Sequence, residues 1–468
     1  MDQSVISRAV RAAEGRFAPG HLGELTQQVP FEMVDAALAE TCRVQQRVRD
    51  LPARVVVYLV LAGCLFAELG YGRVWDRMVA GLDGPPAARP TEGALRQARA
   101  RLGPEPLRAL FALLRGPAPV PAGTAGVRWK GLLPVAVDGT IMTVADTPAN
   151  LAVYSKHKGG PTGGSGYPFL RLVALVSCGT RSIIDATFGP ASAGETSYAP
   201  CLLGSLRAGM LLLADRGFGY GILASQVAAT GAGFLLRVRS GASGARFPVM
   251  ARCPDGSWLS LLGGVPVRVI DAQVAITTTA GSTAGRCRLV TTLLDPAAYP
   301  AGELVALYRQ RWEAETVYLE LKSTILGGRV LRARTPAGVD QEVHALLVAY
   351  QALRTAMADA TSTVPGTDPD RASFSIALDT ARDQVILAAG IIAGPATDLA
   401  GRIGERVLAR LMPSRRLRTG PRVVKRAISK YNARGKPDRT TRKATIAITI
   451  CAAPSTGDSA PLTTRPWG

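Results

Sequence analysis

The sequence predicts an α/β protein with a helical N-terminal domain, a β-rich insertion, and a helical, basic C-terminal region. Three observations support this fold class. Residues 1 to about 115 contain helical runs that are broken at prolines. From Gly131, short β-like runs bounded by Gly and Pro combine with helical runs in the order β-β-β-α-β-α-β. After residue 339, most of the chain again has a helical pattern.

The N-terminal helices are expected to break at Pro30, at Pro52, in "DGPPAARP" and in "GPEP". The run "VVVYLVLAGCLFAEL" at 55–69 is shorter than the roughly 20 residues that span a membrane, and it predicts a buried helix. A later helix, "TEGALRQARARLG", is either a helix that reads a DNA groove or only a basic surface. Its candidate contacts are Arg96, Gln97, Arg99 and Arg101.

Two aspartates follow hydrophobic runs and precede Gly-containing turns. Asp138 closes "LLPVAVDGT", and Asp215 closes "MLLLADRGFG". Each is therefore expected at the carboxyl end of a buried strand, where open α/β sheets place their ligands. Asp before Gly is also a common turn residue, so each aspartate alone has a purely structural alternative.

The domain boundaries follow from these changes in pattern. The helical domain covers 1–116, and the α/β core covers 130–239 and 296–360. The β-rich insertion, with Gly turns and Trp258, covers 240–295. Residues 361–468 form the helical and basic C-terminal region, in which Pro413 to Lys443 holds twelve Lys or Arg against one acid.

The composition limits the class of protein. The formal net charge of +20 indicates a polyanionic partner such as nucleic acid. Seven scattered cysteines without a CxxC pair argue against a disulfide framework and a zinc site, and three histidines argue against a His-based metal cluster. The N-terminus lacks the apolar core of a signal peptide, so we expect a cytoplasmic protein.

The stretch "YRQRWEAETVYLELK" at 308–322 predicts a helix with a narrow functional stripe. Four side chains at offsets 0, 3, 7 and 14 fall within roughly 60° of one another on an α-helix. They are Tyr308, Arg311, Glu315 and Lys322. Arg309, Glu313 and Glu320 point the other way, and Trp312 is expected to pack in the core. Most charged helical stripes are only solvated surfaces, so this one needs a partner elsewhere in the chain.

Asp138 and Asp215 are the candidate partners of Glu315 in this stripe. Three carboxylates on separate elements are suitable hard oxygen ligands for Mg²⁺ or Mn²⁺. Two such ions about 4 Å apart can activate the attacking oxygen and stabilise the leaving oxygen in phosphodiester chemistry. The positive surplus would then offset DNA phosphates around an acidic centre.

These features resemble a known family. The β-β-β-α-β-α-β order with Asp, Asp and Glu resembles the ribonuclease-H-like core of DDE transposases. The spacing Tyr-x2-Arg-x3-Glu-x6-Lys matches the signature of the insertion-element-four family, and the resemblance runs from about Arg16 to Lys443. It includes the family's helical N-terminal domain and its β-rich insertion.

The resemblance implies a transposase that binds the terminal inverted repeats of an insertion sequence, cleaves them, in some members through a hairpin, and joins them to target DNA. It implies two Mg²⁺ ions, replaceable by Mn²⁺, a homodimer in the synaptic complex, and action at the nucleoid without a membrane. Asp138, Asp215 and Glu315 would hold the ions. Lys322 would bind the DNA backbone. Four further residues are candidate DNA contacts, and two of them have a structural alternative. The four are Tyr308, Arg311, Trp258 (base stacking or core packing) and Arg216 (a phosphate contact or a turn cap).

Alternative functions remain. "VAVDGT" resembles the aspartate-loop phosphatases, but position 136 is Ala where their nucleophile would stand. A catalytically inactive, transposase-derived DNA-binding regulator and another ribonuclease-H-like nuclease stay open. "KHKGGPTGGSG" lacks the GK[ST] of a P-loop, so it predicts a flexible loop near the site instead. Its Lys156, His157 and Lys158 could contact DNA.

Overall fold

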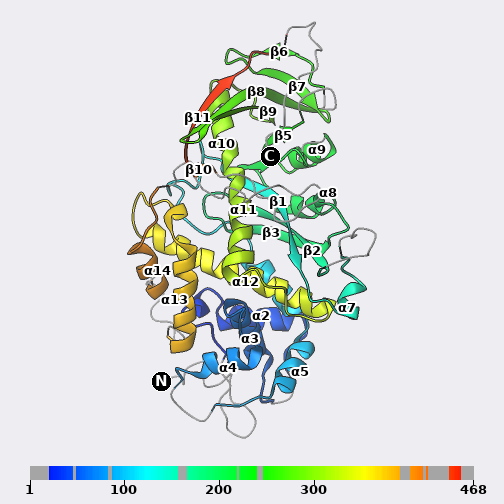
Figure 1. The fold of residues 1–468 in the computed structure, drawn as a ribbon, viewed down its shortest axis with the longest axis vertical. Helices are drawn as coiled ribbons and strands as arrows, with labels where there is room; N and C mark the ends of the chain where they lie inside the picture. Colours follow the sequence, from blue (N-terminus) through cyan, green and yellow to red (C-terminus); the bar gives the residue numbers. More distant parts are fainter. Residues whose placement is uncertain are drawn as a thin grey trace. The chain divides into compact units, whose positions relative to one another are not determined.

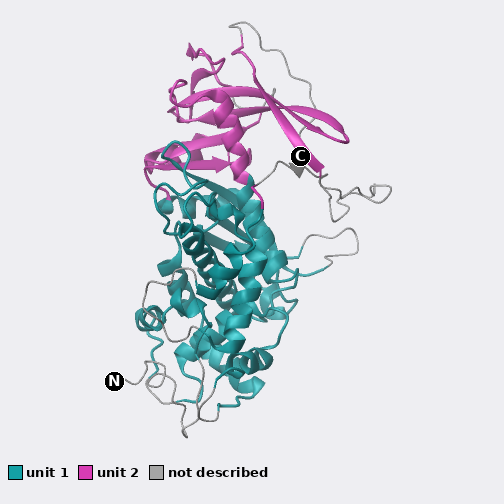
Figure 2. Ribbon diagram, turned by 90° about the vertical axis from the view of Figure 1, so that its left-hand side faces the viewer, with its two compact units in different colours: residues 1–205, 312–412 teal, residues 206–311, 413–468 magenta. Residues whose placement is uncertain are grey.

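The computed structural model divides into two compact units (Figure 2). Unit 1 comprises Met1–Ser205 and Trp312–Met412, and unit 2 comprises Leu206–Arg311 and Pro413–Gly468. The structure describes residues 20–45, 49–82, 87–156, 166–218, 221–239, 246–389, 401–414, 418–419 and 442–454.

The N-terminal part of unit 1 is helical, as predicted. The helices are α2 (Phe31–Glu40), α3 (Ala53–Leu65), α4 (Tyr71–Val79), α5 (Glu92–Leu102) and α6 (Glu105–Leu114). Pro30, Pro52 and Pro104 directly precede α2, α3 and α6, because proline suits a helix start but not its interior. The apolar helix α3 is buried from Val55 onward. Among the described residues, no helix is long and apolar enough to cross a membrane.

Unit 1 also contains three antiparallel strands with helices packed on them (Figure 1). The strands are β1 (Leu133–Thr143), β2 (Phe169–Ser177) and β3 (Ile183–Pro190). Short helical turns follow them as α8 (Glu195–Tyr198) and η3 (Ala199–Ser205). Helix α11 (Trp312–Leu319) packs against β1 and β2. The long helix α12 (Pro336–Ser362) packs against α3 and α6 and is the central helix of the unit's core.

The remaining helical elements of unit 1 are α7 (Pro148–Leu151), η2 (Leu25–Gln27), η5 (Glu320–Ile325), η6 (Pro369–Arg371), α13 (Phe374–Leu387) and α14 (Gly401–Leu408). Helices α13 and α14 pack against each other and against α12.

Unit 2 begins with a parallel pair of strands. Strand β4 (Met210–Ala214) is joined through α9 (Gly221–Ala229) to β5 (Gly233–Val238). The region predicted as a β-rich insertion follows and forms β6 (Ala251–Arg252), β7 (Trp258–Leu262), β8 (Val265–Thr278) and β9 (Gly281–Thr291). Strand β9 pairs with β5, and the chain then enters α10 (Ala301–Leu307) and the 3-10 turn η4 (Tyr308–Arg311).

The order of elements along the chain is that of a ribonuclease-H-like core with an insertion. Three antiparallel strands precede a helical segment, strand β4, helix α9 and strand β5. The insertion strands β6 to β9 then separate β5 from the helices α10 and α11. The predicted fold class is confirmed.

The C-terminal region departs from the helical pattern that the sequence predicts for it. Arg442–Ile450 forms strand β11, which pairs antiparallel with β8 in unit 2, and Arg418–Thr419 forms the short strand β10 beside it. The sequence "RKATIAITI" is rich in β-branched residues, and its burial alternates along the strand. Period-two alternation of this kind favours a strand over a helix. Most of the basic segment from Pro413 to Lys443 lies outside the described residues.

Candidate active site

Asp215 lies where the sequence predicts, directly after a buried strand of unit 2. All five residues of β4 are buried, and Asp215 follows the last of them. Its Oδ1 accepts a hydrogen bond from the backbone N–H of Arg216 at 2.7 Å. Arg216 itself is exposed in the turn. The carboxylate is thus fixed by the backbone that follows it.

Tyr308 anchors the start of the signature segment beside Asp215. Its hydroxyl donates to the backbone oxygen of Ala214 at 3.2 Å. Burial raises the pKa of Tyr308 above its usual value; the charge of Arg311 lowers it and that of Asp215 raises it. These influences place Tyr308, Arg311 and Asp215 near one another within unit 2. The Arg311 side chain is buried there, so most of its guanidinium is covered by protein.

Asp138 lies inside a strand, and the prediction that it closes the strand is wrong. Strand β1 continues to Thr143, because β2 supplies antiparallel partners along that whole length. The Oδ1 of Asp138 accepts the backbone N–H of Gly139 at 2.8 Å. Gly139 makes no turn here but admits a neighbour, since a Cβ at this position would lie 2.4 Å from Cγ of Glu195. The residues before Asp138 are buried and those directly after it are only half-buried.

Tyr318 connects the Glu315 helix to Asp138. The Tyr318 hydroxyl donates to the backbone oxygen of Asp138 and accepts the N–H of Ala174 at 3.0 Å. Ala174 is the residue of β2 that pairs with Asp138. Burial raises the pKa of Tyr318 well above its usual value, so the hydroxyl stays protonated. Glu315 is exposed on the same helix, three residues before Tyr318 and therefore on a neighbouring face.

The side chain of Lys322, in η5, contacts β1 two residues beyond Asp138. Its Nζ donates to Oγ1 of Thr140 at 3.2 Å. Thr140 is two residues beyond Asp138, and side chains two apart in a strand share one face of the sheet. Within unit 1, Tyr318 thus contacts β1 at Asp138, and Lys322 contacts it at Thr140. Glu315 lies one turn before the first of these contacts.

The segment 308–322 is not one continuous α-helix, which corrects the predicted stripe. Residues 308–311 form the 3-10 turn η4, residues 312–319 form α11, and Glu320–Ile325 forms the π-helical turn η5. A constant 100° per residue therefore does not hold from Tyr308 to Lys322. The predicted stripe assumed regular helical geometry, which this segment does not have.

Two further residues beside Asp138 were missed by sequence reasoning. Tyr318 lies within the signature segment between Glu315 and Lys322, so its position was visible, but its contact with a strand 180 residues away was not. Glu195 packs against Gly139, and its carboxylate accepts a bond from Arg171 Nη1 at 2.8 Å. Nothing in the local sequence around Glu195 indicates this position.

The predicted metal ligands are divided between the units, with Asp138 and Glu315 in unit 1 and Asp215 in unit 2. Among the residues that the structure describes, no group of three His, Cys, Asp or Glu side chains could hold a metal ion. The donor set nevertheless fits Mg²⁺, which prefers carboxylate oxygens. This ion usually binds one or two carboxylates together with waters and substrate phosphates, and not an all-protein cage.

Two tryptophans have different environments. Trp258 is 1% exposed, and its indole N–H donates to the backbone oxygen of Phe247 at 3.3 Å. Core packing accounts for this position, and the ring is not accessible for stacking on a base. Trp312, predicted to pack in the core, is 54% exposed, and Leu319 on the same helix is 59% exposed. The core prediction for Trp312 is wrong because the buried face of α11 is formed by other residues, Glu313 among them.

This contrast predicts opposite results for two alanine variants. Trp258→Ala should lower the free energy of unfolding by about 3–5 kcal/mol, because it empties a buried site. Trp312→Ala should change that free energy by less than about 0.5 kcal/mol, as is usual at exposed positions. Denaturant unfolding of the two variants checks this. An unaffected Trp258→Ala would show that the buried ring contributes no packing energy.

The other predicted DNA-contact elements are partly described. Lys156 Nζ bonds Asp146 Oδ2 at 2.5 Å, while His157 and Lys158 lie outside the described residues. On α5, Arg99 stacks over the ring of Tyr71, with the guanidinium carbon 3.7 Å from the ring centroid. The other three candidates on that helix are exposed, namely Arg96, Gln97 and Arg101.

Comparison with known families decides the identity of the chain. The description "Insertion element 4 transposase N-terminal" matches residues 19–112, and "Transposase DDE domain" matches residues 129–352. The chain belongs to the insertion element 4 family of DDE transposases. The second match contains Asp138, Asp215 and Glu315, and it implies a DNA-cleaving enzyme.

A protein sequence and a solved structure are similar to this chain. The transposase InsG of insertion sequence element IS4 from Escherichia coli (strain K12) is 28% identical over 419 residues, covering 86% of this chain and 91% of that protein. A cryo-EM structure of the piggyBac transposase synaptic complex with hairpin DNA has a TM-score of 0.44 and 9% identity. It covers 83% of this chain and 84% of that one.

Proposed function

We propose that this transposase binds the ends of an insertion sequence, cleaves them by metal-dependent phosphodiester hydrolysis and joins them to target DNA. The observation that carries the proposal is a tyrosine hydrogen bond to the backbone at or beside each aspartate. Tyr318 donates to the backbone oxygen of Asp138, and Tyr308 donates to that of Ala214, directly before Asp215. Both tyrosines come from the signature segment, so this segment is bonded to the backbone that carries each aspartate.

Asp138, Asp215 and Glu315 are the residues proposed to hold two Mg²⁺ ions, or Mn²⁺ in their place. Bound there, the ions would supply Lewis-acid activation of the attacking oxygen and stabilisation of the leaving oxygen. The backbone N–H groups of Gly139 and Arg216 each hold one Oδ1 of the adjacent aspartate. These bonds fix the orientation of each carboxylate.

The cations around these carboxylates are proposed to hold DNA. Lys322 lies beside Thr140, on the face of β1 that carries Asp138, where its ammonium can bind a backbone phosphate. Arg216 is exposed directly after Asp215. Tyr308 and Arg311, in unit 2, are also proposed to contact DNA. Arg311 is buried, so only part of its guanidinium would reach a phosphate.

Trp312 and Leu319 are proposed as an apolar contact for an unpaired base. They are exposed on α11, three residues before and four residues after Glu315. These spacings put all three side chains on one side of an α-helix. Stacking on an exposed indole is worth about 1–3 kcal/mol per base in proteins that bind single strands. This role replaces the one predicted for Trp258.

The rest of the function is proposed from the family. The protein would act as a homodimer in the synaptic complex and work on DNA at the nucleoid in the cytoplasm. A hairpin intermediate would separate cleavage of the first strand from that of the second. The two alternatives are a catalytically inactive DNA-binding regulator and a ribonuclease-H-like nuclease without end specificity.

Cleavage of a linear DNA carrying the inverted repeats that flank the coding sequence tests this proposal. The full-length protein should nick at the repeat ends with Mg²⁺, lose the activity in EDTA and regain it with Mn²⁺. The matched control is the same DNA with scrambled ends. Binding without nicking would identify a regulator, and equal cutting of both DNAs would identify a nuclease.

A further inference from the structure

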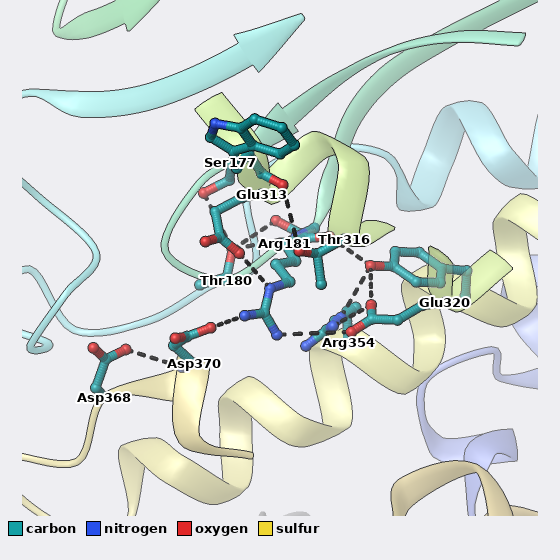
Figure 3. Close-up of polar contacts among 12 residues, drawn as sticks. Ser177, Thr180, Arg181, Glu313, Thr316, Glu320, Arg354, Asp368 and Asp370 are labelled. Carbon is teal, nitrogen blue, oxygen red and sulfur yellow. Dashed lines mark hydrogen bonds and ion pairs between the residues drawn. The ribbon is translucent and has the colours of Figure 1, made fainter. Parts of the chain in front are cut away.

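A buried ionic network joins Arg181 and Arg354 to Glu313 and Glu320 of the signature segment (Figure 3). Arg181, in the turn between β2 and β3, contacts three carboxylates. Its Nε donates to Glu313 at 2.6 Å, its Nη1 lies 3.7 Å from Glu320, and its Nη2 donates to Asp370. The Arg181 side chain is only 3% exposed, and those of Glu313 and Glu320 are 8% and 9% exposed. Arginines are rarely this buried unless they are paired with acids.

A second arginine extends the network to the core helix α12. Arg354 donates through Nη2 to Glu320 and through Nε to the hydroxyl of Tyr350 at 3.1 Å. The Tyr350 hydroxyl is 2.8 Å from Glu320 and 3.1 Å from the backbone oxygen of Arg181. Burial and the charge of Arg354 lower the pKa of Arg181 to about 10, so Arg181 remains charged at neutral pH.

The backbone at Arg181 is in an unfavourable conformation. Its φ is +57°, in the left-handed region that an arginine rarely adopts. Such a residue costs of order 1–3 kcal/mol and persists only where its surroundings compensate. The contacts of the guanidinium are the compensation available here. Arg181 is thus held at a position where glycine or asparagine would be the less strained choice.

Apolar burial orients α11 only in part. Ala314, Val317 and Tyr318 are buried along one stripe of the helix, while Trp312 and Leu319 are exposed. Hydrophobic contacts are non-directional, whereas ion pairs with hydrogen bonds fix orientation. Glu313 is about 200° from Glu315 on an α-helix, which is nearly the opposite face.

We propose that Arg181, Glu313 and Glu320 form a positioning network that fixes the rotation of α11 and thereby aims the Glu315 carboxylate. This inference rests on the proposed function, in which Glu315 is a metal ligand. Two of the three acids on Arg181 come from the Glu315 segment, one before and one after Glu315. Arg181 therefore holds this segment at two points on either side of the ligand. Residues of this kind typically change metal affinity or activity by about 10–100-fold when they are replaced.

The test compares two buried glutamates in the full-length protein. Glu313→Gln removes one charge from the network. Glu342→Gln is the matched control, because Glu342 is a buried acid of unit 1 whose carboxylate bonds Arg332 and the backbone N–H groups of Arg332 and Ala333, away from α11. The probe is Mn²⁺ alone, and the free ion is measured by electron paramagnetic resonance. Thermal unfolding and the Mg²⁺ concentration for half-maximal nicking are measured beside it.

We expect Glu313→Gln to weaken Mn²⁺ binding and to raise the half-maximal Mg²⁺ concentration by about tenfold or more. Glu342→Gln should lose comparable stability with metal affinity unchanged. Arg181→Lys, which keeps the charge but not the fork, should reproduce the metal effect if Glu313→Gln does not fold. Unchanged Mn²⁺ affinity in Glu313→Gln, or in Arg181→Lys where the first variant is unfolded, would overturn the inference. Wild-type protein that neither binds Mn²⁺ nor nicks would refute the proposed function instead.

Discussion

Asp138→Asn, Asp215→Asn and Glu315→Gln should each reduce cleavage at the transposon end to background while leaving end binding largely intact. Each change removes a negative charge proposed to coordinate an ion and keeps the shape of the side chain. The charges are not needed to hold DNA, since the phosphates are contacted by cations. Gel-shift and cleavage assays on the same DNA separate the two effects. Retained cleavage in any one variant would remove that residue from the site.

The amide variants also separate the site from the fold. Asp138 and Asp215 are only half-buried and Glu315 is exposed, so none of the three changes empties a packed site. The Tm of each variant should therefore stay close to that of the wild-type protein. A variant that loses both stability and DNA binding is replaced by one that keeps a carboxylate at the same position, Glu for Asp or Asp for Glu. Mn²⁺ should partly restore cleavage by this second variant.

Tyr318→Phe should lower cleavage by about 10–100-fold, because it releases the Glu315 helix from Asp138 without touching a proposed ligand. It removes the hydroxyl that links the Asp138 carbonyl to the Ala174 N–H. Losing a buried hydrogen-bond partner should cost about 1–3 kcal/mol of stability. Cleavage rate at saturating DNA and the free energy of unfolding are both measured.

Tyr58→Phe is the control for that variant. Tyr58 is also fully buried in unit 1, and its hydroxyl donates to the backbone oxygen of Val29 at 2.7 Å. Both partners of this bond belong to the N-terminal helical part. The two variants should lose similar stability, but only Tyr318→Phe should lose cleavage. Equal losses of cleavage would mean that Tyr318 acts through general stability and does not position the site.

The chain order of the fold could be predicted because its signals are local. Prolines precede α2, α3 and α6, and hydrophobic runs bounded by glycine form the strands. The end of β1 was misjudged at Gly139, since glycine there serves a close approach of Glu195 and the strand continues against β2. Strand β11 was missed because its pattern was judged together with the basic segment before it. Its partner β8 lies more than 160 residues earlier in the chain.

The candidate site shows the same division. The residue types and spacing of the signature segment predict Tyr308, Arg311, Glu315 and Lys322 as site residues, because chemistry that needs those groups leaves a pattern in the sequence. The tether from Tyr318 and the network around Arg181 join residues more than 130 positions apart, and no local pattern records such contacts. The exposure of Trp312 was missed for a related reason. Glu313 occupies the buried face of α11 where an apolar residue would ordinarily be expected.

The most direct test of the central claim is the anomalous diffraction of Mn²⁺ in a crystal of the full-length protein bound to its transposon end. The account predicts two Mn²⁺ peaks at the scissile phosphate, with Asp138, Asp215 and Glu315 among their ligands and oxygen–metal distances near 2.1 Å. It also predicts that Tyr318 remains bonded to the backbone oxygen of Asp138. Metal peaks at the scissile phosphate that exclude Glu315, with its carboxylate turned away from both aspartates, would contradict the account.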